Sequence, residues 1–241
     1  MFIKSHLILS CLILFSLSQI AFTAENKIVL KGFSQNQNWE RSHSDYGLDV
    51  YTTKIPNSKL LGFKLSGVVD ANIQPLMATL RNVERSAEWT PELLQKKTIQ
   101  NISDNEAITY SLNNLPWPLS DRDFILHNKL FLSHDQKLLF VLSRSVKHKN
   151  YPENKNVVRA WIHYSNIGVR PIDNKRTYVE WTLFVDPRGN LPAWLVNFYQ
   201  SRFPIKFFVM ARNRANDVPV KLPFGMSSLL NKLNEILKSS K

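Results

Sequence analysis

Residue types that carry out most enzyme chemistry are sparse and scattered in this sequence. The 241 residues include one cysteine, Cys11, and six histidines, and no His-Glu-x-x-His or Gly-x-Ser-x-Gly motif occurs. No two of the seven glycines lie two positions apart, which excludes the glycine-rich loops that hold nucleotide phosphates. The run Ser42–Asp45 is more typical of a solvated turn than of a triad, whose members meet in space. The sequence therefore offers little support for nucleotide, thiol or metal chemistry.

Isolated polar side chains on apolar strands are better candidates, because they could hydrogen-bond the polar group of a ligand. Asn128 lies on an otherwise apolar strand face, and a buried amide needs a partner. Arg122 has a structural alternative, which is to pair with Asp121 or Asp123. The polar residues predicted to contact a ligand are Tyr110, Arg122, Asn128, Arg159 and His163.

Apolar side chains would form the rest of such a site. Residues 124–132 and 176–185 alternate so that one face of each predicted strand is apolar, and an apolar helix begins near residue 190. This surface could be a solid core or the wall of a cavity, and periodicity does not separate the two. The apolar residues predicted to contact a ligand are Phe124, Leu126, Trp181, Leu183, Trp194, Phe198 and Phe208.

The elements that must position these residues follow an α+β order. Asp70 or Asn72 can cap a first helix, which has Pro75 in its first turn. Strands joined by short polar turns predict an antiparallel meander, and one long helix follows the last strand. The predicted strands are 47–52, 61–69, 107–112, 124–132, 137–146, 157–167 and 176–185.

Both ends of the chain have a distinct composition. Residues 1–24 combine Lys4, an apolar run over 7–17 and a small residue, Ala24, which is typical of a cleaved signal peptide. A cleaved signal peptide predicts a periplasmic or secreted protein. The mature chain would hold no cysteine, which fits a bacterial periplasm better than an animal secretory route. One domain is expected at 25–220, followed by an amphipathic helical tail at 221–241. That tail could pack onto its own domain, contact a membrane or pair with a second copy.

The net charge of +12 at pH 7 favours anionic partners. For an exported protein these are lipid headgroups rather than nucleic acid, so we expect peripheral contact with an anionic membrane surface. We expect the protein to be a monomer. The basic residues from position 202 onward are Arg202, Lys206, Arg212, Arg214, Lys221, Lys232, Lys238 and Lys241.

Three segments resemble the START family, the steroidogenic acute regulatory protein-related lipid-transfer domains. Residues 115–125, LPWPLSDRDFI, resemble the segment that leads into a central strand of the family. Residues 181–192, WTLFVDPRGNLP, resemble the junction between its last strand and long helix, and 158–160 match the strand between more weakly. The resemblance extends from about residue 39 to residue 215.

The resemblance implies a helix-grip fold, in which a curved antiparallel sheet wraps around a long C-terminal helix. It also implies an interior tunnel for one lipid or other hydrophobic ligand, which is carried without chemistry or cofactor. Sterol-carrying relatives have a buried arginine six residues after the motif arginine, where this chain has Asn128, and Thr109 lies near the place of its carboxylate partner. Recognition through that ion pair is therefore not expected. A helix-grip enzyme acting on a hydrophobic substrate and a ligand-sensing module stay open as alternatives.

Overall fold

The computed structural model describes residues 38–115, 119–217, 222 and 224–239. The chain divides into two units, Met1–Asn38 and Trp39–Lys241, and the second contains the fold described below. The predicted signal peptide, 1–24, and the Pro-Trp-Pro segment at 116–118 lie outside the described residues.

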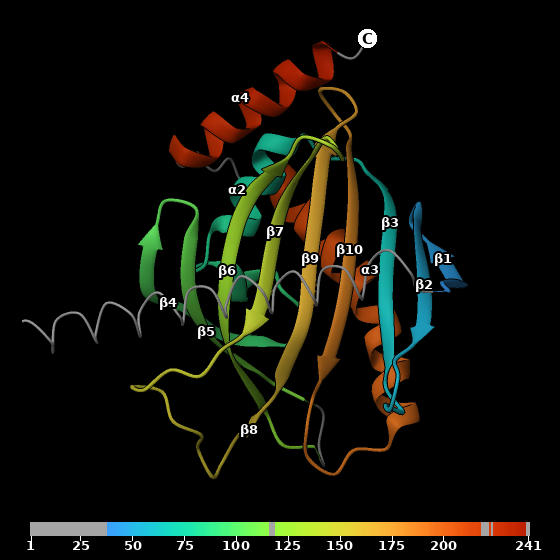
Figure 1. Cartoon of the computed structure of the whole chain (residues 1–241), viewed down its shortest axis with the longest axis vertical. Coiled ribbons are helices and arrows are strands. Elements are labelled where there is room, and N and C mark those ends of the chain that lie inside the picture. Colours follow the sequence, from blue (N-terminus) through green and yellow to red (C-terminus); the bar gives the residue numbers. More distant parts are fainter. Residues whose placement is uncertain (1–37, 116–118, 218–221, 223, 240–241) are drawn as a thin grey trace, which may run out of the picture. The chain divides into compact units, whose positions relative to one another are not determined.

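One sheet forms the framework of this unit, with its strands in the order β1-β2-β3-β10-β9-β7-β6-β5-β4 (Figure 1). Neighbours in this order are antiparallel, and the short β8 pairs in parallel with β6. The α+β meander predicted from the turns is confirmed. The strands are β1 (Glu40–Asp45), β2 (Leu48–Lys54), β3 (Leu61–Val69), β4 (Leu93–Ser103), β5 (Glu106–Asn113), β6 (Arg122–Ser133), β7 (Leu138–Ser145), β8 (Val158–Arg159), β9 (Trp161–Pro171) and β10 (Thr177–Asp186).

Two strands were not predicted, β1 and β4, which are the edges of the sheet. Most side chains of both strands are exposed and polar, so they lack the apolar alternation that identified the others. Another difference is that the predicted strand 157–167 is divided at Ala160 into β8 and β9.

Helix α2 (Ile73–Arg81) begins where the sequence predicted. The side chain of Asn72 accepts a hydrogen bond of 2.8 Å from the backbone N–H of Gln74, so Asn72, and not Asp70, is the cap. Leu76 and Met77 are fully buried, as expected of the apolar stripe. A short 3-10 helix, η1 (Ser86–Glu88), leads from α2 to β4.

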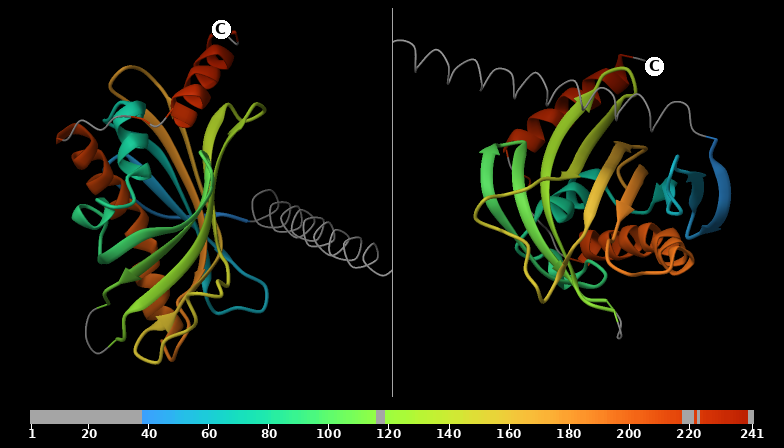
Figure 2. Two further views of the ribbon diagram at one scale, coloured as in Figure 1. Left: turned by 90° about the vertical axis from the view of Figure 1, so that its left-hand side faces the viewer. Right: turned by 60° about the horizontal axis from the view of Figure 1, so that its bottom comes forward.

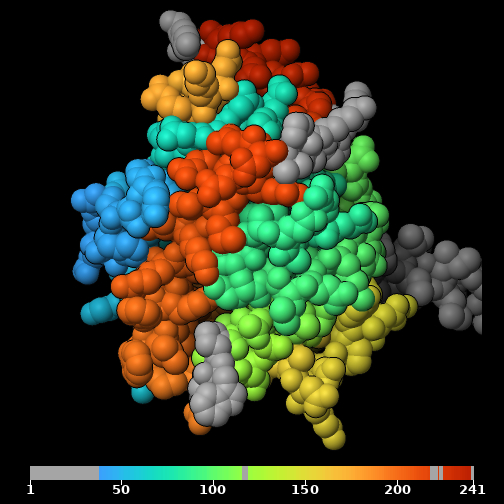
Figure 3. All heavy atoms as spheres, turned by 180° about the vertical axis from the view of Figure 1, so that it is seen from behind, coloured from blue at the N-terminus to red at the C-terminus, as the bar shows by residue number. Residues whose placement is uncertain are grey.

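The long helix α3 (Ala193–Asp217) follows β10 and packs against α2, β2 and β3. Figure 2 shows the sheet curved, with α2 and α3 on the same side of it. In the space-filling view of that side, the orange surface of α3 borders the green surface of the chain around β4 (Figure 3). Phe208 of α3 is fully buried against Trp181 of β10, and their rings lie 6.1 Å apart. The main core therefore lies between α3 and the sheet.

A last helix, α4 (Phe224–Lys238), packs near β6 and β7. Its apolar stripe is buried, with Met226, Leu230 and Leu233 each at most 3% exposed. Of the three arrangements left open for the tail, packing on its own unit is the one observed. Among the described helices, none combines the length and apolar character needed to cross a membrane.

Candidate functional site

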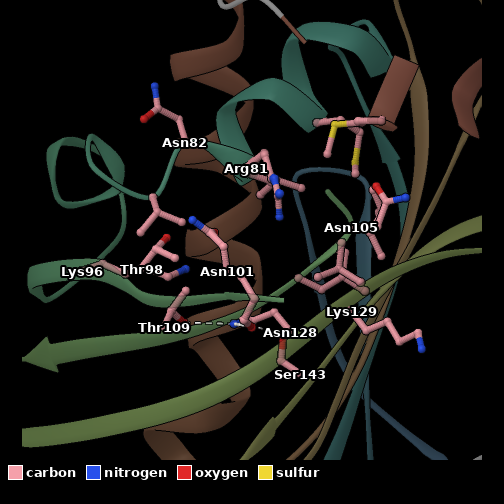
Figure 4. A pocket seen from close by; sticks show the side chains of 18 of the residues that line it. Arg81, Asn82, Lys96, Thr98, Asn101, Asn105, Thr109, Asn128, Lys129 and Ser143 are labelled. Carbon is pink, nitrogen blue, oxygen red and sulfur yellow. Dashed lines mark hydrogen bonds between the residues drawn. The ribbon is translucent and has the colours of Figure 1, made fainter. Parts of the chain in front are cut away.

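A cavity of about 360 Å³ lies where the β4–β9 part of the sheet faces α2, α3 and α4 (Figure 4). Both polar and apolar side chains form its wall. The wall consists of Met77, Leu80, Arg81, Asn82, Val83, Glu84, Lys96, Thr98, Asn101, Asn105, Ala107, Thr109, Asn128, Lys129, Leu130, Val141, Ser143, Ile167, Phe207 and Met226.

A hydrogen-bonded group of three side chains from β5, β6 and β7 forms part of the sheet wall. The amide of Asn128 donates to the hydroxyl of Thr109 at 3.0 Å and to the carbonyl of Leu126 at 2.9 Å. The hydroxyl of Ser143 donates to Asn128 Oδ1 at 2.7 Å. Asn128 therefore has the partners that a part-buried amide requires, and all of them come from the protein.

The edge strand β4 places a lysine in the wall. Lys96 pairs with Ser111 and Thr98 pairs with Thr109, so Lys96 and Thr98 share the sheet face that carries the cavity. Burial lowers the pKa of the Lys96 ammonium group. Within the described residues, Lys96 has neither a hydrogen bond nor an ion pair.

The other side of the cavity is held by contacts between α2, α4 and the turn that joins β4 to β5. Arg81, in the last turn of α2, donates to the backbone carbonyl of Asp104 at 2.7 Å. The next residue of the turn is Asn105, and its Oδ1 atom is buried without a hydrogen-bond partner among the described residues. Met226 at the start of α4 completes this part of the wall.

Of the twelve residues predicted to contact a ligand, Asn128 lies in the cavity wall. Phe124 and Leu126 pair with Ser111 and Thr109, so they share the face of the cavity without lining it. Three more residues belong to the adjoining core: Trp181, Leu183 and Phe208. Trp181 and Phe208 adjoin the wall, because their rings lie 5.0 and 5.5 Å from that of Phe207.

The two predicted arginines are held by the protein. Arg159 forms a buried ion pair with Asp123, with N–O distances of 2.6 and 2.9 Å, and hydrogen bonding to Asp123 raises the pKa of Arg159. Arg122 donates to the backbone carbonyls of Ser120, Pro187 and Arg188. Asp123 is thus the partner of Arg159, so a pairing of Asp123 with Arg122 is not what the structure shows.

Tyr110 and His163 lie on strand positions that face away from the cavity. Tyr110 alternates with Thr109 on β5, and its ring contacts that of Tyr151 at 5.6 Å. Burial and the nearby Asp123 carboxylate raise the pKa of Tyr110. His163 stacks on Phe184 at 4.8 Å, and burial lowers its pKa.

Trp194 and Phe198 lie on the outside of α3, where they are 70% and 54% exposed. The guanidinium group of Arg202 lies 3.8 Å from the ring centre of Phe198. A Trp, a Phe and an Arg on one exposed stretch of helix are typical of an interaction surface. They do not line the cavity.

The sequence reasoning missed most of the polar cavity wall. Lys96, Thr98 and Asn101 belong to β4, which was not predicted, and Asn105 belongs to the turn that follows it. The Asp104-Asn105 pair between two strands is a hairpin signal that could have revealed β4. Asn82 lies just after the predicted helix, where no pattern indicated a role.

Comparison with known proteins identifies the class of fold. Human STARD10 superimposes with a TM-score of 0.70, at 22% identity, over 77% of this chain and 76% of that structure. The STAR-related lipid transfer protein of Xanthomonas axonopodis has a TM-score of 0.65, at 23% identity, and covers 74% of this chain and 99% of that fragment. The predicted helix-grip fold is therefore confirmed.

The family model described as START domain matches residues 19–219. The chain belongs to the START domain family. One relative is an uncharacterised protein of Pseudomonas aeruginosa, which is 22% identical over 74% of this chain and 87% of its own length. Another is the phosphatidylcholine transfer protein of Rattus norvegicus, which is 23% identical over 66% of this chain and 75% of its own length. Human START domain-containing protein 10 is 26% identical over 66% of this chain, which spans 55% of that longer protein. Helix α4 lies beyond the segment that the family model matches.

Proposed function

We propose that this protein is a non-enzymatic carrier, which binds one lipid or similar hydrophobic ligand in the cavity and exchanges it with membranes. The cavity between the sheet and the helices is the observation that carries the proposal. Membership of a family whose relatives include a phosphatidylcholine transfer protein supports lipid as the ligand.

The energetics of the cavity suit exchange. Burying a methylene group contributes about 0.8 kcal/mol relative to water, and a bilayer offers a similar gain. Transfer between bilayer and cavity is therefore near balance for the apolar part of a ligand. Selectivity then depends on the polar wall, where an unsatisfied buried group costs about 1–3 kcal/mol.

The enzyme alternative needs an acid and a base beside the substrate. The hydrogen-bonded side chains on the sheet wall, Thr109, Asn128 and Ser143, are amide and hydroxyl groups that do not titrate near neutral pH. Their bonds to one another favour recognition over proton transfer. The wall also holds Lys96, but within the described residues no hydrogen bond or ion pair joins it to a second titratable group.

A transfer assay tests the carrier proposal directly. Donor vesicles containing a fluorescent phospholipid or fatty acid and a quencher are mixed with acceptor vesicles, and dequenching is followed with and without protein. A carrier accelerates transfer in proportion to its concentration. A protein that binds the fluorescent lipid but leaves the transfer rate unchanged would instead be a sensing module. Unaltered lipids recovered with the protein after long incubation would support the non-enzymatic assignment.

We further propose that the protein acts outside the cytoplasm as a monomer and touches anionic membrane surfaces. The composition of residues 1–24, the net charge of +12 and the exposed Trp194 and Phe198 support this proposal. Cell fractionation with N-terminal sequencing of the mature protein tests the cleavage. Light scattering coupled to size-exclusion chromatography tests the monomer.

A further inference from the structure

We infer that the cavity takes a single-chain amphiphile with an anionic head, a carboxylate or a phosphate, and that the ammonium group of Lys96 binds that head. The inference rests on the proposed function, because it names the class of ligand for the same cavity.

The position of Lys96 is the first argument. Its strand register places it beside Ser111, on the face that also presents Thr98 and Thr109 to the cavity. Lys96 is part-buried, and an ammonium group partly withdrawn from water without an anionic partner is costly to the folded protein. Burial lowers the pKa of Lys96, as expected for such a group. A bound anion would supply the missing partner.

The other charged groups of the wall are engaged or exposed. Arg81 donates to the carbonyl of Asp104 at 2.7 Å. Lys129 has its ammonium group 3.5 Å from the carboxylate of Glu106, and Figure 4 shows its side chain extending away from the other labelled groups. Glu84 is exposed and has no ion pair within the described residues. Lys96 is therefore the cation in the described wall that lacks a protein acceptor.

The size and lining of the cavity limit the rest of the ligand. A volume of about 360 Å³ is near the lower end of small-molecule sites, which span about 300–1,000 Å³. That volume favours one hydrocarbon chain over the two chains of a phospholipid. Apolar wall residues from both the helices and the sheet can pack against such a chain: Met77, Leu80, Leu130, Val141, Ile167 and Phe207.

Two fluorescent probes that differ only at the head group test the inference, cis-parinaric acid and its methyl ester. The variants are K96M, which removes the charge, K96R, which keeps it, and the matched control K97M. Lys97 is the next residue of β4, and its ammonium group lies over the rings of Tyr110 and Tyr151, away from the cavity. We expect K96M to weaken binding of the acid about ten- to hundredfold, as for loss of a hydrogen bond to a charged group. K97M should bind the acid like the wild type, and K96R, which keeps the charge, should bind it more tightly than K96M does. K96M should bind the uncharged ester at least as well as the wild type.

The outcomes distinguish a failure of the role proposed for Lys96 from a failure of the carrier function. Equal affinity of wild type and K96M for the acid, with the ester also bound, would overturn the role of Lys96 and leave the hydrophobic cavity intact. Failure of both probes to bind any of the four proteins would overturn both the role of Lys96 and the carrier function. Displacement of the bound acid by palmitate or by lysophosphatidic acid then tells a carboxylate ligand from a phosphate ligand. Equally strong displacement by the zwitterionic lysophosphatidylcholine would contradict an anionic head group.

Discussion

Asn128 and Thr109 are joined by a hydrogen bond of 3.0 Å between neighbouring strands, inside the cavity wall. The family resemblance places a buried arginine and its carboxylate partner at these two positions in sterol-carrying members. Here a neutral amide and a hydroxyl group take their places, and Ser143 completes the group at 2.7 Å from Asn128. The polar side chains of the wall at this point are thus hydrogen-bonded to one another. The charged side chain of the wall that lacks an acceptor within the described residues is Lys96, on β4.

We expect N128A to lower the free energy of unfolding by about 1–3 kcal/mol, because Thr109 and Ser143 would lose their shared partner. Urea unfolding followed by circular dichroism measures this. T98A is the control, since Thr98 lines the same wall on the exposed edge strand and should change stability by at most about 0.5 kcal/mol. Equal stability of N128A and wild type would show that the three side chains contribute little.

The buried ion pair between Asp123 and Arg159 is expected to be structural. Their side chains are 4% and 7% exposed, so R159M leaves an uncompensated buried carboxylate and should cost about 3–5 kcal/mol. The double variant D123L/R159M should recover much of this loss. Because both residues lie outside the cavity wall, the affinity of the folded variants for cis-parinaric acid should match that of wild type. Loss of affinity in the double variant would support the ligand role predicted for Arg159 from the sequence.

Lys96 should make the stability of the ligand-free protein depend on pH. Burial lowers the pKa of Lys96 in the folded protein below the ordinary 10.5 of the unfolded chain. At a pH between these two pKa values, Lys96 holds a proton in the unfolded chain and has released it in the folded protein. The free energy of unfolding therefore rises with pH between these two pKa values. Below both values Lys96 is charged in the folded protein, and the full cost of that charge is present. K96M removes the penalty. We expect a higher melting temperature for K96M near neutral pH, by about 2–4 °C for each kcal/mol, and a smaller difference from wild type at pH 10. A K96M protein that melts below the wild type across the whole range would contradict the burial of an unpaired charge.

Helix α4 is expected to control access to the cavity, because Met226 forms part of its wall. A Cβ atom added at Gly225 would lie 3.0 Å from the Cβ of Asp104, and a disulfide needs about 3.5–4.5 Å, so D104C/G225C can form a bond after a shift of about half an ångström. We expect the oxidised variant to release cis-parinaric acid more slowly than the same protein in reductant. The single variant G225C, treated identically, is the control. Equal release rates in oxidised and reduced protein would indicate that the ligand leaves by another route.

Trp194 and Phe198 are expected to insert into the membrane interface. Each buried aromatic side chain contributes about 1.5–3 kcal/mol, so W194A/F198A should weaken binding to phosphatidylglycerol vesicles by at least about tenfold. Vesicle sedimentation measures this. Y46A is the control, because Tyr46 is 61% exposed in the turn between β1 and β2. If Y46A and W194A/F198A lose affinity equally, the α3 surface has no special role in docking.

Local pattern in the sequence predicted the α+β order, with the inner strands of the sheet and the helices, but not the edge strands β1 and β4. Asn72 caps α2, the apolar alternation of β6 and β10 marks their buried faces, and the motif residues around Arg122 and Gly189 indicate the family. These features depend on neighbours along the chain, because capping, alternation and turn formation act over a few residues. Asn128 was predicted on the same basis, as a lone amide on an apolar strand.

The cavity itself depended on contacts between distant segments. Lys96 on an exposed polar strand has no local feature that distinguishes it from Lys97, and only the pairing of β4 with β5 turns one toward the cavity and the other away. Arg122 and Arg159 looked alike in the sequence, yet folding gives one backbone carbonyls and the other Asp123. Local physics thus determined which elements form, whereas the side chains that meet across the interior were decided by strand register and helix packing.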